Sequence, residues 1–197
     1  MRHAPATLRN REPILNMLKQ LLPQRGLLLE IASGTGEHAA FMAPALAGLV
    51  WQPSEADPAA LDDINARTQA SGCSRILPAL QLDVTAANWP IDRADAIFCC
   101  NMIHIAPWTA AEGMFAGAAR LLPPSALLIL YGPFKRNGEH TAPSNAQFET
   151  WLQGSDPRYG VRCLDSEVLP LAESNGFALA EIVTMPANNL SVIWRRR

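Results

Sequence analysis

Two glycines with acidic residues on either side are the first feature of this sequence that could perform chemistry. Gly34 and Gly36 follow the apolar run Leu27–Ile31 in the pattern G-x-G-x-x-A, and helix-forming residues come next. A strand that feeds a glycine turn and then a helix is typical of a nucleotide-binding loop. Glu55 lies 19 residues after Gly36, where dinucleotide-binding proteins place the carboxylate that binds a ribose hydroxyl. The spacing predicts a nucleotide-type cofactor without choosing which one.

Glu30 favours a cofactor other than a dinucleotide. It stands near the carboxyl end of the otherwise apolar run Leu27–Ile31, beside the glycine loop. A pyrophosphate would be repelled by a carboxylate so close to the helix N-terminus that should receive it. S-adenosylmethionine (SAM) carries a cationic sulfonium and an ammonium group and no phosphate, so an acid at this place suits it. The alternative is that Glu30 accepts hydrogen bonds from the loop amides and does not touch the ligand.

Two more carboxylates follow neighbouring apolar runs. Glu55 comes after Leu49–Pro53, and Asp83 ends the run Gln81–Asp83. In open α/β sheets, ligands bind beyond the carboxyl ends of the strands. We therefore expect Glu55 to accept hydrogen bonds from the ribose hydroxyls and Asp83 to accept one from the adenine amino group. Each acid alone is also typical of a loop or a helix cap, and Asp57 is predicted to be such a cap.

The elements that must position these residues alternate along the chain. Short apolar runs alternate with helical patterns, which predicts an α/β, doubly wound, mostly parallel sheet with helices on both faces. The expected strands are Leu27–Ile31, Leu49–Pro53, a strand ending at Asp83, Ala94–Cys100 and Ala126–Tyr131. The expected helices are Arg11–Leu22 capped by Asn10, one from about Gly36 to Pro44, one capped by Asp57 with Pro58 in its first turn, and one from a capping box at Thr109–Glu112 through Leu122.

The pattern changes after Tyr131. A loop rich in Gly, Pro and basic residues is expected over 132–143, and two further helices are expected at Ser144–Leu152, opened by a capping box, and at about Ser166–Asn175. The last apolar runs, Phe177–Met185 and Leu190–Trp194, are close enough in sequence to pair as an antiparallel unit. We expect a single domain over residues 1–197, with an N-terminal helical cover in 1–25 and an insertion in 132–176.

Composition restricts the classes of partner. Apolar residues make up 49% of the 197 residues and charged residues 17%, which is typical of a globular protein. The net charge of −2 favours neither nucleic acid nor an acidic membrane as a partner, and no apolar run is long enough to span a bilayer. The four cysteines lack C-x-x-C spacing, so reduced thiols in a cytoplasmic protein are expected rather than a metal site. Nothing in the sequence indicates an oligomeric state.

Seven stretches of the chain carry a resemblance to a known family. They read LLEIASGTGEH, WQPSEAD, LQLDV, CCNMIHIAPW, LYGPF with a downstream SNAQFE, and MPANN. Together they resemble a small group of class I SAM-dependent methyltransferase-like proteins that occurs in bacteria and in animals. The resemblance extends over nearly the whole chain. It implies a Rossmann-like sheet of seven strands whose C-terminal strand pair is antiparallel, with SAM as the cofactor.

The resemblance also assigns residues to the cofactor site. It places Ser33, Gly34 and Gly36 in the SAM loop, Glu55 at the ribose, and Asp83 and Val84 at the adenine. Asn101 and Met102 would lie where the fourth strand meets the ligand. Two residues depart from the wider methyltransferase pattern, because Ala32 stands where the first glycine of the loop is usual and Glu55 where aspartate is common.

The catalytic candidates are His104 and Tyr131. Methyl transfer is an in-line displacement, and holding the two reactants in position supplies much of its acceleration, so a general base is needed only for a protonated acceptor. His104 follows the fourth strand and can titrate near neutrality, or it can simply be packed in the core. Tyr131 ends the fifth strand and could face the acceptor, or be an amphipathic edge residue. Asn188 and Asn189 could donate hydrogen bonds to a polar acceptor or form a turn.

We therefore expect a SAM-dependent methyltransferase that acts on a small-molecule acceptor. The segment after the fourth strand reads Asn101-Met102-Ile103-His104, which counts against methylation of a nucleobase amine through an Asn-Pro-Pro-Tyr-type tetrapeptide. A protein that binds SAM or its product S-adenosylhomocysteine (SAH) without efficient catalysis is the alternative. A nicotinamide-dependent oxidoreductase is the third hypothesis, and Glu30 disfavours it.

Overall fold

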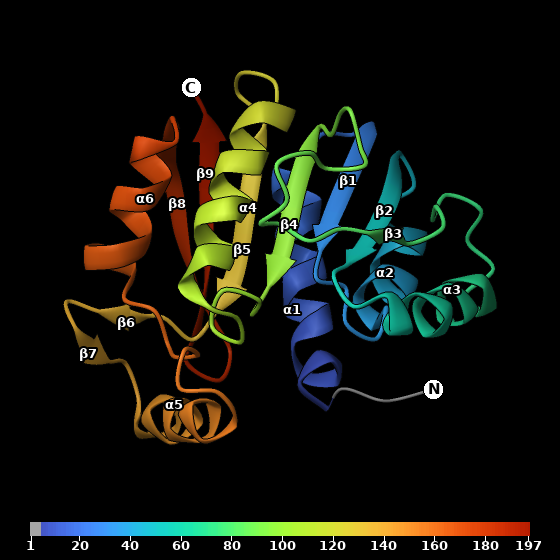
Figure 1. Cartoon of the computed structure of the whole chain (residues 1–197). Helices are drawn as coiled ribbons and strands as arrows, with labels where there is room; N and C mark the ends of the chain where they lie inside the picture. Colours follow the sequence, from blue (N-terminus) through green and yellow to red (C-terminus); the bar gives the residue numbers. More distant parts are fainter. Residues whose placement is uncertain (1–4) are drawn as a thin grey trace. The chain divides into compact units, whose positions relative to one another are not determined.

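The structure, a computed structural model, describes residues 5–197 and contains one sheet of seven strands (Figure 1). The strand order is β3-β2-β1-β4-β5-β9-β8. The bounds are β1 (Gly26–Ile31), β2 (Leu49–Glu55), β3 (Leu80–Gln81), β4 (Ala96–Cys100), β5 (Leu127–Gly132), β8 (Phe177–Met185) and β9 (Asn189–Arg196). β1 pairs in parallel with β2 and β4, whereas β9 is antiparallel to both β5 and β8. The predicted fold class, including the antiparallel C-terminal pair, is confirmed.

The chain forms two compact units. The first, which we call the glycine-loop unit, comprises the described part of Met1–Asp83 together with Trp89–Cys99. Its helices are α1 (Pro5–Leu21), α2 (Glu37–Met42) and α3 (Leu61–Ala70), with the 3₁₀ turns η1 (Ala43–Ala45) and η2 (Pro58–Ala60). Leu28, Leu29, Trp51 and Phe98 are fully buried in this unit, and parallel strands buried on both faces read as such continuous apolar runs.

The second unit, the C-terminal unit, comprises Val84–Asn88 and Cys100–Arg197. It contains β5, β8 and β9 with helices α4 (Trp108–Leu121), α5 (Pro143–Ser155) and α6 (Leu169–Ser174), the π-helical turn η3 (Leu164–Val168), and a two-stranded sheet of β6 (Lys135–Arg136) and β7 (Glu139–His140). Phe115 of α4 contacts the rings of Trp194 on β9 and Phe177 on β8, with centroids 5.5 and 5.9 Å away. These edge-to-face contacts fix α4 on the antiparallel strands.

Three predicted helix starts are wrong. α1 begins at Pro5 rather than Arg11. Asn10 therefore lies within the helix and does not cap it, and its buried side chain accepts a hydrogen bond from His38 on α2. α4 begins at Trp108 and α5 at Pro143, so neither predicted capping box opens its helix. The start of α5 is set by Pro143, whose fixed φ and missing N–H suit the first turn of a helix.

The remaining predicted strands and helices differ from the structure by a few residues at their ends, but the loop expected over 132–143 contains the paired short strands β6 and β7. Asp57 caps the turn at Pro58 as predicted, accepting a hydrogen bond from Ala59 N at 2.9 Å. β8 matches its predicted bounds, and a three-residue loop, Pro186–Asn188, joins it to β9. Within residues 5–197, no helix is both long and apolar enough to cross a membrane.

Candidate functional site

The glycine loop lies between β1 and α2 in a tight left-handed turn. Gly34 has φ of 59° and Gly36 φ of 72°, and Gly36 N donates to Ser33 O at 2.9 Å. Ala32 also has a positive φ, 56°, in the region that favours glycine. A Cβ at Gly34 would meet nothing within 4 Å, whereas one at Gly36 would lie 3.1 Å from the side chain of Ile64 on α3. Gly34 therefore faces open space, and Gly36 permits close packing of the loop on α3.

Glu55 holds this loop through a direct hydrogen bond. It is the last residue of β2, and its Oε2 accepts from Gly34 N at 2.9 Å while its Oε1 accepts from Ala56 N at 2.9 Å. A backbone hydrogen bond also joins the loop to β2, since Ser33 N donates to Ser54 O at 2.8 Å. The carboxylate predicted to bind ribose thus lies against the glycine loop, with the amide of Gly34 pointing at it.

Glu30 lies beneath the loop and is 1% exposed. Its Oε2 accepts hydrogen bonds from Trp51 Nε1 at 2.9 Å and from Ser33 Oγ at 3.0 Å. Burial raises the pKa of the Glu30 carboxyl to about 7, against these two hydrogen bonds, which lower it. No Lys or Arg in the described chain forms an ion pair with it. Glu30 is therefore a buried carboxyl, held by two neutral donors, that a cation brought by a ligand would help to ionise.

His38 does not supply that cation. Its Nδ1 lies 3.8 Å from Glu30 Oε1, and its Nε2 donates to Asn10 Oδ1 at 2.9 Å. Burial lowers the pKa of His38 to about 4, so the ring is neutral at physiological pH. The bond to Asn10 joins α2 to α1. His38 thus supports the loop from behind.

An open pocket adjoins the loop within the same unit. It has a volume of about 320 Å³ and is lined by Gly34, Thr35, Asp57, Ala59, Ala60, Asp63 and Arg67. Arg67 forms an ion pair with Glu37 at 3.4 Å, and Thr35 Oγ1 donates to the same Glu37 carboxylate at 3.2 Å. The pocket therefore begins at the glycine turn and continues along the start of α3.

The other predicted cofactor contacts divide between the units. Asp83 is exposed just after β3, and the neighbouring Leu82 N donates to Glu55 O of β2 at 2.9 Å. The predicted contacts that belong to the glycine-loop unit are Glu30, Ser33, Gly34, Gly36, Glu55 and Asp83. Val84, Asn101 and Met102 belong to the C-terminal unit. There, Asn101 has φ of 62° and its N–H donates to Tyr131 O at 2.8 Å, which places it at the carboxyl end of β5.

His104 is a fully buried, neutral residue. Its Nδ1 accepts from Arg162 N at 3.2 Å, so the proton is on Nε2, which finds no hydrogen-bond partner within residues 5–197. A Cβ at Gly132 would clash with this Nε2, so the ring packs against the Gly132 backbone. Burial, with a smaller effect from the positive charge of Arg162, lowers the pKa of His104 to about 3. A ring in this state is a weak proton acceptor.

This burial predicts a specific pH dependence of stability. As pH falls below the ordinary histidine pKa of about 6.5, the unfolded chain takes up a proton at His104 while the folded chain does not, so stability falls by about 1.4 kcal/mol per pH unit from this one group. We expect His104→Leu to lose less stability than the wild type between pH 6.5 and 4.5. Urea unfolding of both proteins across this range measures the difference. Parallel curves would show that His104 is not held neutral.

Tyr131, Asn188 and Asn189 all belong to the C-terminal unit. Tyr131 is 4% exposed within β5, opposite Ser191 on β9. Asn188 has φ of 58° in the β8–β9 loop and its carbonyl accepts from Asn145 Nδ2 at 3.0 Å. Asn189 Nδ2 donates back to Pro186 O and Ala187 O at 3.2 and 3.0 Å. Asn188 thus lies in the turn between β8 and β9, and Asn189 begins β9; their predicted contact with a substrate stays a prediction.

Two residues in this arrangement have roles that no sequence pattern reveals. Trp51 lies on β2, and its indole N–H donates to the Glu30 carboxyl; in the sequence it is the first residue of WQPSEAD, a stretch that carries the family resemblance but assigns Trp51 no role. Arg162 donates from Nε to Ile103 O at 2.9 Å and from Nη2 to Ala106 O at 2.8 Å. It thereby fixes the segment that follows β4. A charged residue in an irregular stretch gives no signal of such a role.

Comparison with known proteins shows what this arrangement is similar to. A family model described as "Protein of unknown function (DUF938)" matches residues 1–196. An O-methyltransferase family protein from Burkholderia thailandensis superposes with a TM-score of 0.81 at 17% identity, over 97% of this chain and 57% of that one. The mitomycin 7-O-methyltransferase MmcR gives a TM-score of 0.81 at 17% identity, over 98% and 54% of the two chains.

A third solved structure, PigF with SAH, has a TM-score of 0.76 at 20% identity, over 93% of this chain and 55% of PigF. The chain thus spans about half the length of these proteins. At such identities the likeness concerns the fold, which is that of SAM-dependent methyltransferases.

Proposed function

Because the chain belongs to the DUF938 family, whose description names no activity, we propose its function from the geometry of the glycine loop. We propose a SAM-dependent methyltransferase that acts on a small-molecule acceptor by in-line transfer. The finer placement, in the methyltransferase-like group of bacteria and animals that the sequence resembles, is part of the same proposal.

One observation carries this proposal. Two carboxyls lie against the glycine loop, Glu30 beneath it and Glu55 bonded to Gly34 N at 2.9 Å. A dinucleotide would bring a pyrophosphate to this turn, where the Glu30 carboxyl beneath the loop, once ionised, would repel it. A cationic ligand with ribose hydroxyls suits the same groups. The nicotinamide-dependent alternative is therefore disfavoured by charge.

The residues present fit SAM. Gly34 leaves open space where a Cβ would meet nothing within 4 Å, and the pocket of about 320 Å³ begins there. Glu55 would accept from the ribose hydroxyls, Asp83 from the adenine amino group, and Glu30 would balance the positive charge. By resemblance, Val84, Asn101 and Met102 are also proposed as cofactor contacts. When bound, SAM supplies an electrophilic methyl group.

The protein's own contribution to transfer would be positioning. His104 is buried and its pKa is lowered to about 3, so it is poorly suited to accept a proton from the acceptor. We therefore propose that proximity and orientation carry the rate, and that the acceptor arrives unprotonated or loses its proton to water. The state of His104 also favours a second candidate function, a SAM- or SAH-binding protein without efficient catalysis.

A small molecule remains the proposed acceptor class. MmcR is named as a mitomycin 7-O-methyltransferase, which supports a small-molecule acceptor for a protein of this fold. Nucleic acid and membrane partners stay disfavoured by the net charge of −2. The cytoplasmic location stays a prediction from the cysteines.

Binding measurements on Glu55 variants test the cofactor. We expect SAH to raise the melting temperature by several degrees at 100 times its dissociation constant and NADH to have no effect. Glu55→Ala should weaken SAH binding about 10- to 100-fold, because it removes charge-assisted hydrogen bonds. Glu55→Gln is the matched control, since its amide oxygen can still accept from Gly34 N. It should keep the wild-type stability and retain part of the affinity.

Different contrary results would contradict different parts of the proposal. Stabilisation by NADH and not by SAH would overturn the cofactor assignment. Wild-type SAH affinity in Glu55→Ala would remove Glu55 from the site. Transfer of labelled methyl from SAM to any member of a panel of phenols, amines and thiols would separate the methyltransferase from the binding protein.

A further inference from the structure

Asn10 on α1 fixes the position of the proton on the His38 ring. Its Oδ1 lies 2.9 Å from His38 Nε2, and an amide oxygen can only accept, so Nε2 carries the ring proton. His38 is 7% exposed, and burial lowers its pKa to about 4, so the ring has a single proton at physiological pH. The other ring nitrogen, Nδ1, is therefore unprotonated.

The unprotonated Nδ1 of His38 faces the Glu30 carboxyl, 3.8 Å from its Oε1. Both hydrogen-bond donors to this carboxyl, Trp51 Nε1 and Ser33 Oγ, bond to Oε2, and no donor within residues 5–197 bonds to Oε1. The unprotonated nitrogen of a neutral imidazole carries a lone pair, which repels a carboxylate in a buried place. A protonated Glu30 instead directs its O–H at that lone pair. The geometry therefore favours the protonated carboxyl.

The neighbouring acidic residues act in the same direction or are already paired. Burial, and to a smaller extent the negative charge of Glu55 on β2, raises the pKa of the Glu30 carboxyl to about 7. The pKa of His38 is lowered by burial against the charge of Glu37 on α2, which raises it. Glu37 forms its own ion pair with Arg67 of α3 at 3.4 Å. No group in this set supplies a positive charge to Glu30.

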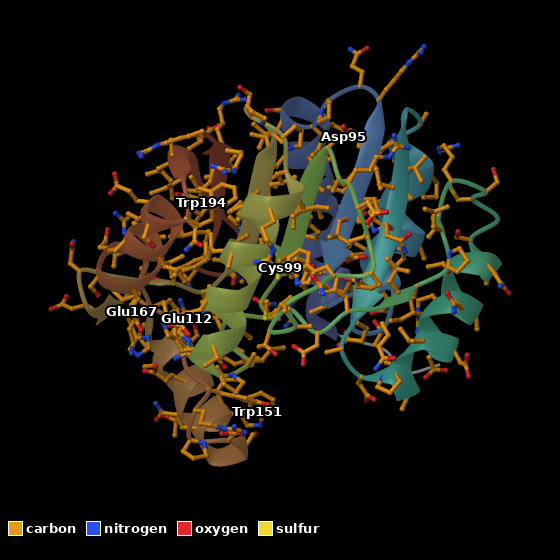
Figure 2. The ribbon with its side chains drawn as sticks, turned by 45° about the horizontal axis from the view of Figure 1, so that its top comes forward. Asp95, Cys99, Glu112, Trp151, Glu167 and Trp194 are labelled. Atoms are coloured by element: carbon orange, nitrogen blue, oxygen red, sulfur yellow. The ribbon has the colours of Figure 1, made fainter. Side chains whose placement is uncertain are left out.

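The other elements packed around the pair bring no cation either. From β4, the ring of Phe98 contacts His38 edge-to-face with centroids 6.0 Å apart, one residue before the Cys99 that Figure 2 labels on this strand. On α1, the guanidinium of Arg11 lies over the ring of Phe41 at 4.3 Å from its centroid. Asn10, His38 and Glu30 thus form a closed chain within the glycine-loop unit.

We propose that Asn10 and His38 keep Glu30 protonated before the cofactor binds, and that Glu30 releases this proton to solvent when the positive charge of the cofactor arrives. In this exchange the carboxyl O–H bond breaks, the carboxylate balances the charge of the ligand, and water takes the proton. The release rests on the proposed function, which supplies a cationic ligand. Asn10 and His38 are positioning residues, because they act on the ligand only through Glu30. Cofactor affinity should therefore rise with pH while Glu30 loses its proton.

NMR of the full chain tests the proton positions without any ligand. The ring nitrogens of His38 are assigned by their loss in His38→Gln, and the carboxyl carbon of Glu30 by its loss in Glu30→Gln. We expect His38 to carry its proton on Nε2 from pH 6 to 8, and Glu30 to titrate near pH 7 rather than near the ordinary pKa of about 4.3. A proton on Nδ1, or a Glu30 carboxyl that titrates normally, would overturn the proposal.

Calorimetric titration with SAM at pH 6 in two buffers of different ionisation enthalpy counts the protons released on binding. We expect the wild type to release about one proton more than Glu30→Gln. Subtracting the variant removes any proton that the ligand itself exchanges. On the same basis, SAM affinity should be about tenfold lower at pH 6 than at pH 8 in the wild type, relative to Glu30→Gln. Equal proton release by the two proteins would overturn the proposal.

Asn10→Leu tests the role of the tautomer from a residue that does not touch the ligand. Without the Asn10 oxygen, His38 can carry its proton on Nδ1 and donate it toward Glu30, so the proton release at pH 6 should fall to about half or less. Thr7→Val is the matched control, because it removes a buried hydroxyl from the same helix and leaves Asn10 in place. It should release as many protons as the wild type. Unchanged release in Asn10→Leu would overturn the part assigned to Asn10 and His38.

The two kinds of measurement separate this proposal from the proposed function. If SAM neither binds nor raises the melting temperature, the proposed function and the proton release fall together. If SAM binds but Glu30 titrates normally in the free protein, the proton release alone is overturned and the cofactor assignment stands.

Discussion

Glu30→Ala is expected to lower the free energy of unfolding by about 3–5 kcal/mol, because it leaves two buried donors without an acceptor and opens a cavity. The donors are Trp51 Nε1 and Ser33 Oγ, 2.9 and 3.0 Å from the Glu30 carboxyl, which is 1% exposed. For a chain of this length the loss corresponds to a melting temperature lower by about 10 °C. Thermal and urea unfolding measure it directly.

Glu30→Gln separates this structural role from ligand binding. Its amide oxygen can still accept from Trp51, and its neutral side chain resembles the protonated carboxyl, whose pKa is raised to about 7 by burial. We expect it to lose about 1 kcal/mol or less of stability, yet to bind SAM at least about tenfold more weakly, because no charge faces the cation. Wild-type SAM affinity in Glu30→Gln would show that Glu30 only supports the loop.

Gly36→Ala is expected to lower the free energy of unfolding by about 2–4 kcal/mol, the sum of a left-handed alanine and an overpacked contact. Its φ is 72°, and the new Cβ would lie 3.1 Å from Ile64 Cγ2 and 3.2 Å from Ile64 Cα. Ile64 is fully buried on α3, so it has little room to move. Urea unfolding measures this loss, and calorimetric titration with SAH measures the accompanying loss of affinity.

Gly34→Ala is the matched control for that variant. Its φ of 59° imposes the same backbone strain, but its Cβ would meet no protein atom within 4 Å. We expect a smaller loss of stability, about 1–2 kcal/mol, together with a large loss of SAH affinity, because the methyl group enters the open space beside the pocket. Equal stability losses in the two variants, or normal SAH binding by Gly34→Ala, would contradict this view of the loop.

Sequence patterns were sufficient for the sheet because strand burial and helix alternation are local signals. The runs at Leu27–Ile31 and Phe177–Met185 carry continuous or alternating apolar residues, and both form strands where predicted. The carboxylates Glu30 and Glu55 could also be placed, since a strand end and the following loop define each position. Because β1 and β2 are adjacent parallel strands, both carboxylates then lie at the glycine loop.

The rest depends on contacts between residues distant in the sequence. The burial of His104 arises from Phe134, Arg162 and Gly132, none of which lies near it in the chain. A histidine after a strand therefore reads as a possible base until its neighbours are known. The start of α1 was missed for a similar reason, because the side chain of Asn10 bonds to His38 on α2 instead of capping the helix.

The hydrogen bond from Gly34 N to Glu55 has a consequence for how a ligand would be received. With this bond and the backbone tie from Ser33 to Ser54, the turn is already rigid when the chain folds. Binding therefore costs little further ordering of the loop, and association should be limited by encounter rather than by rearrangement. The glycine turn is preorganised, so its backbone conformation should be the same with and without SAM.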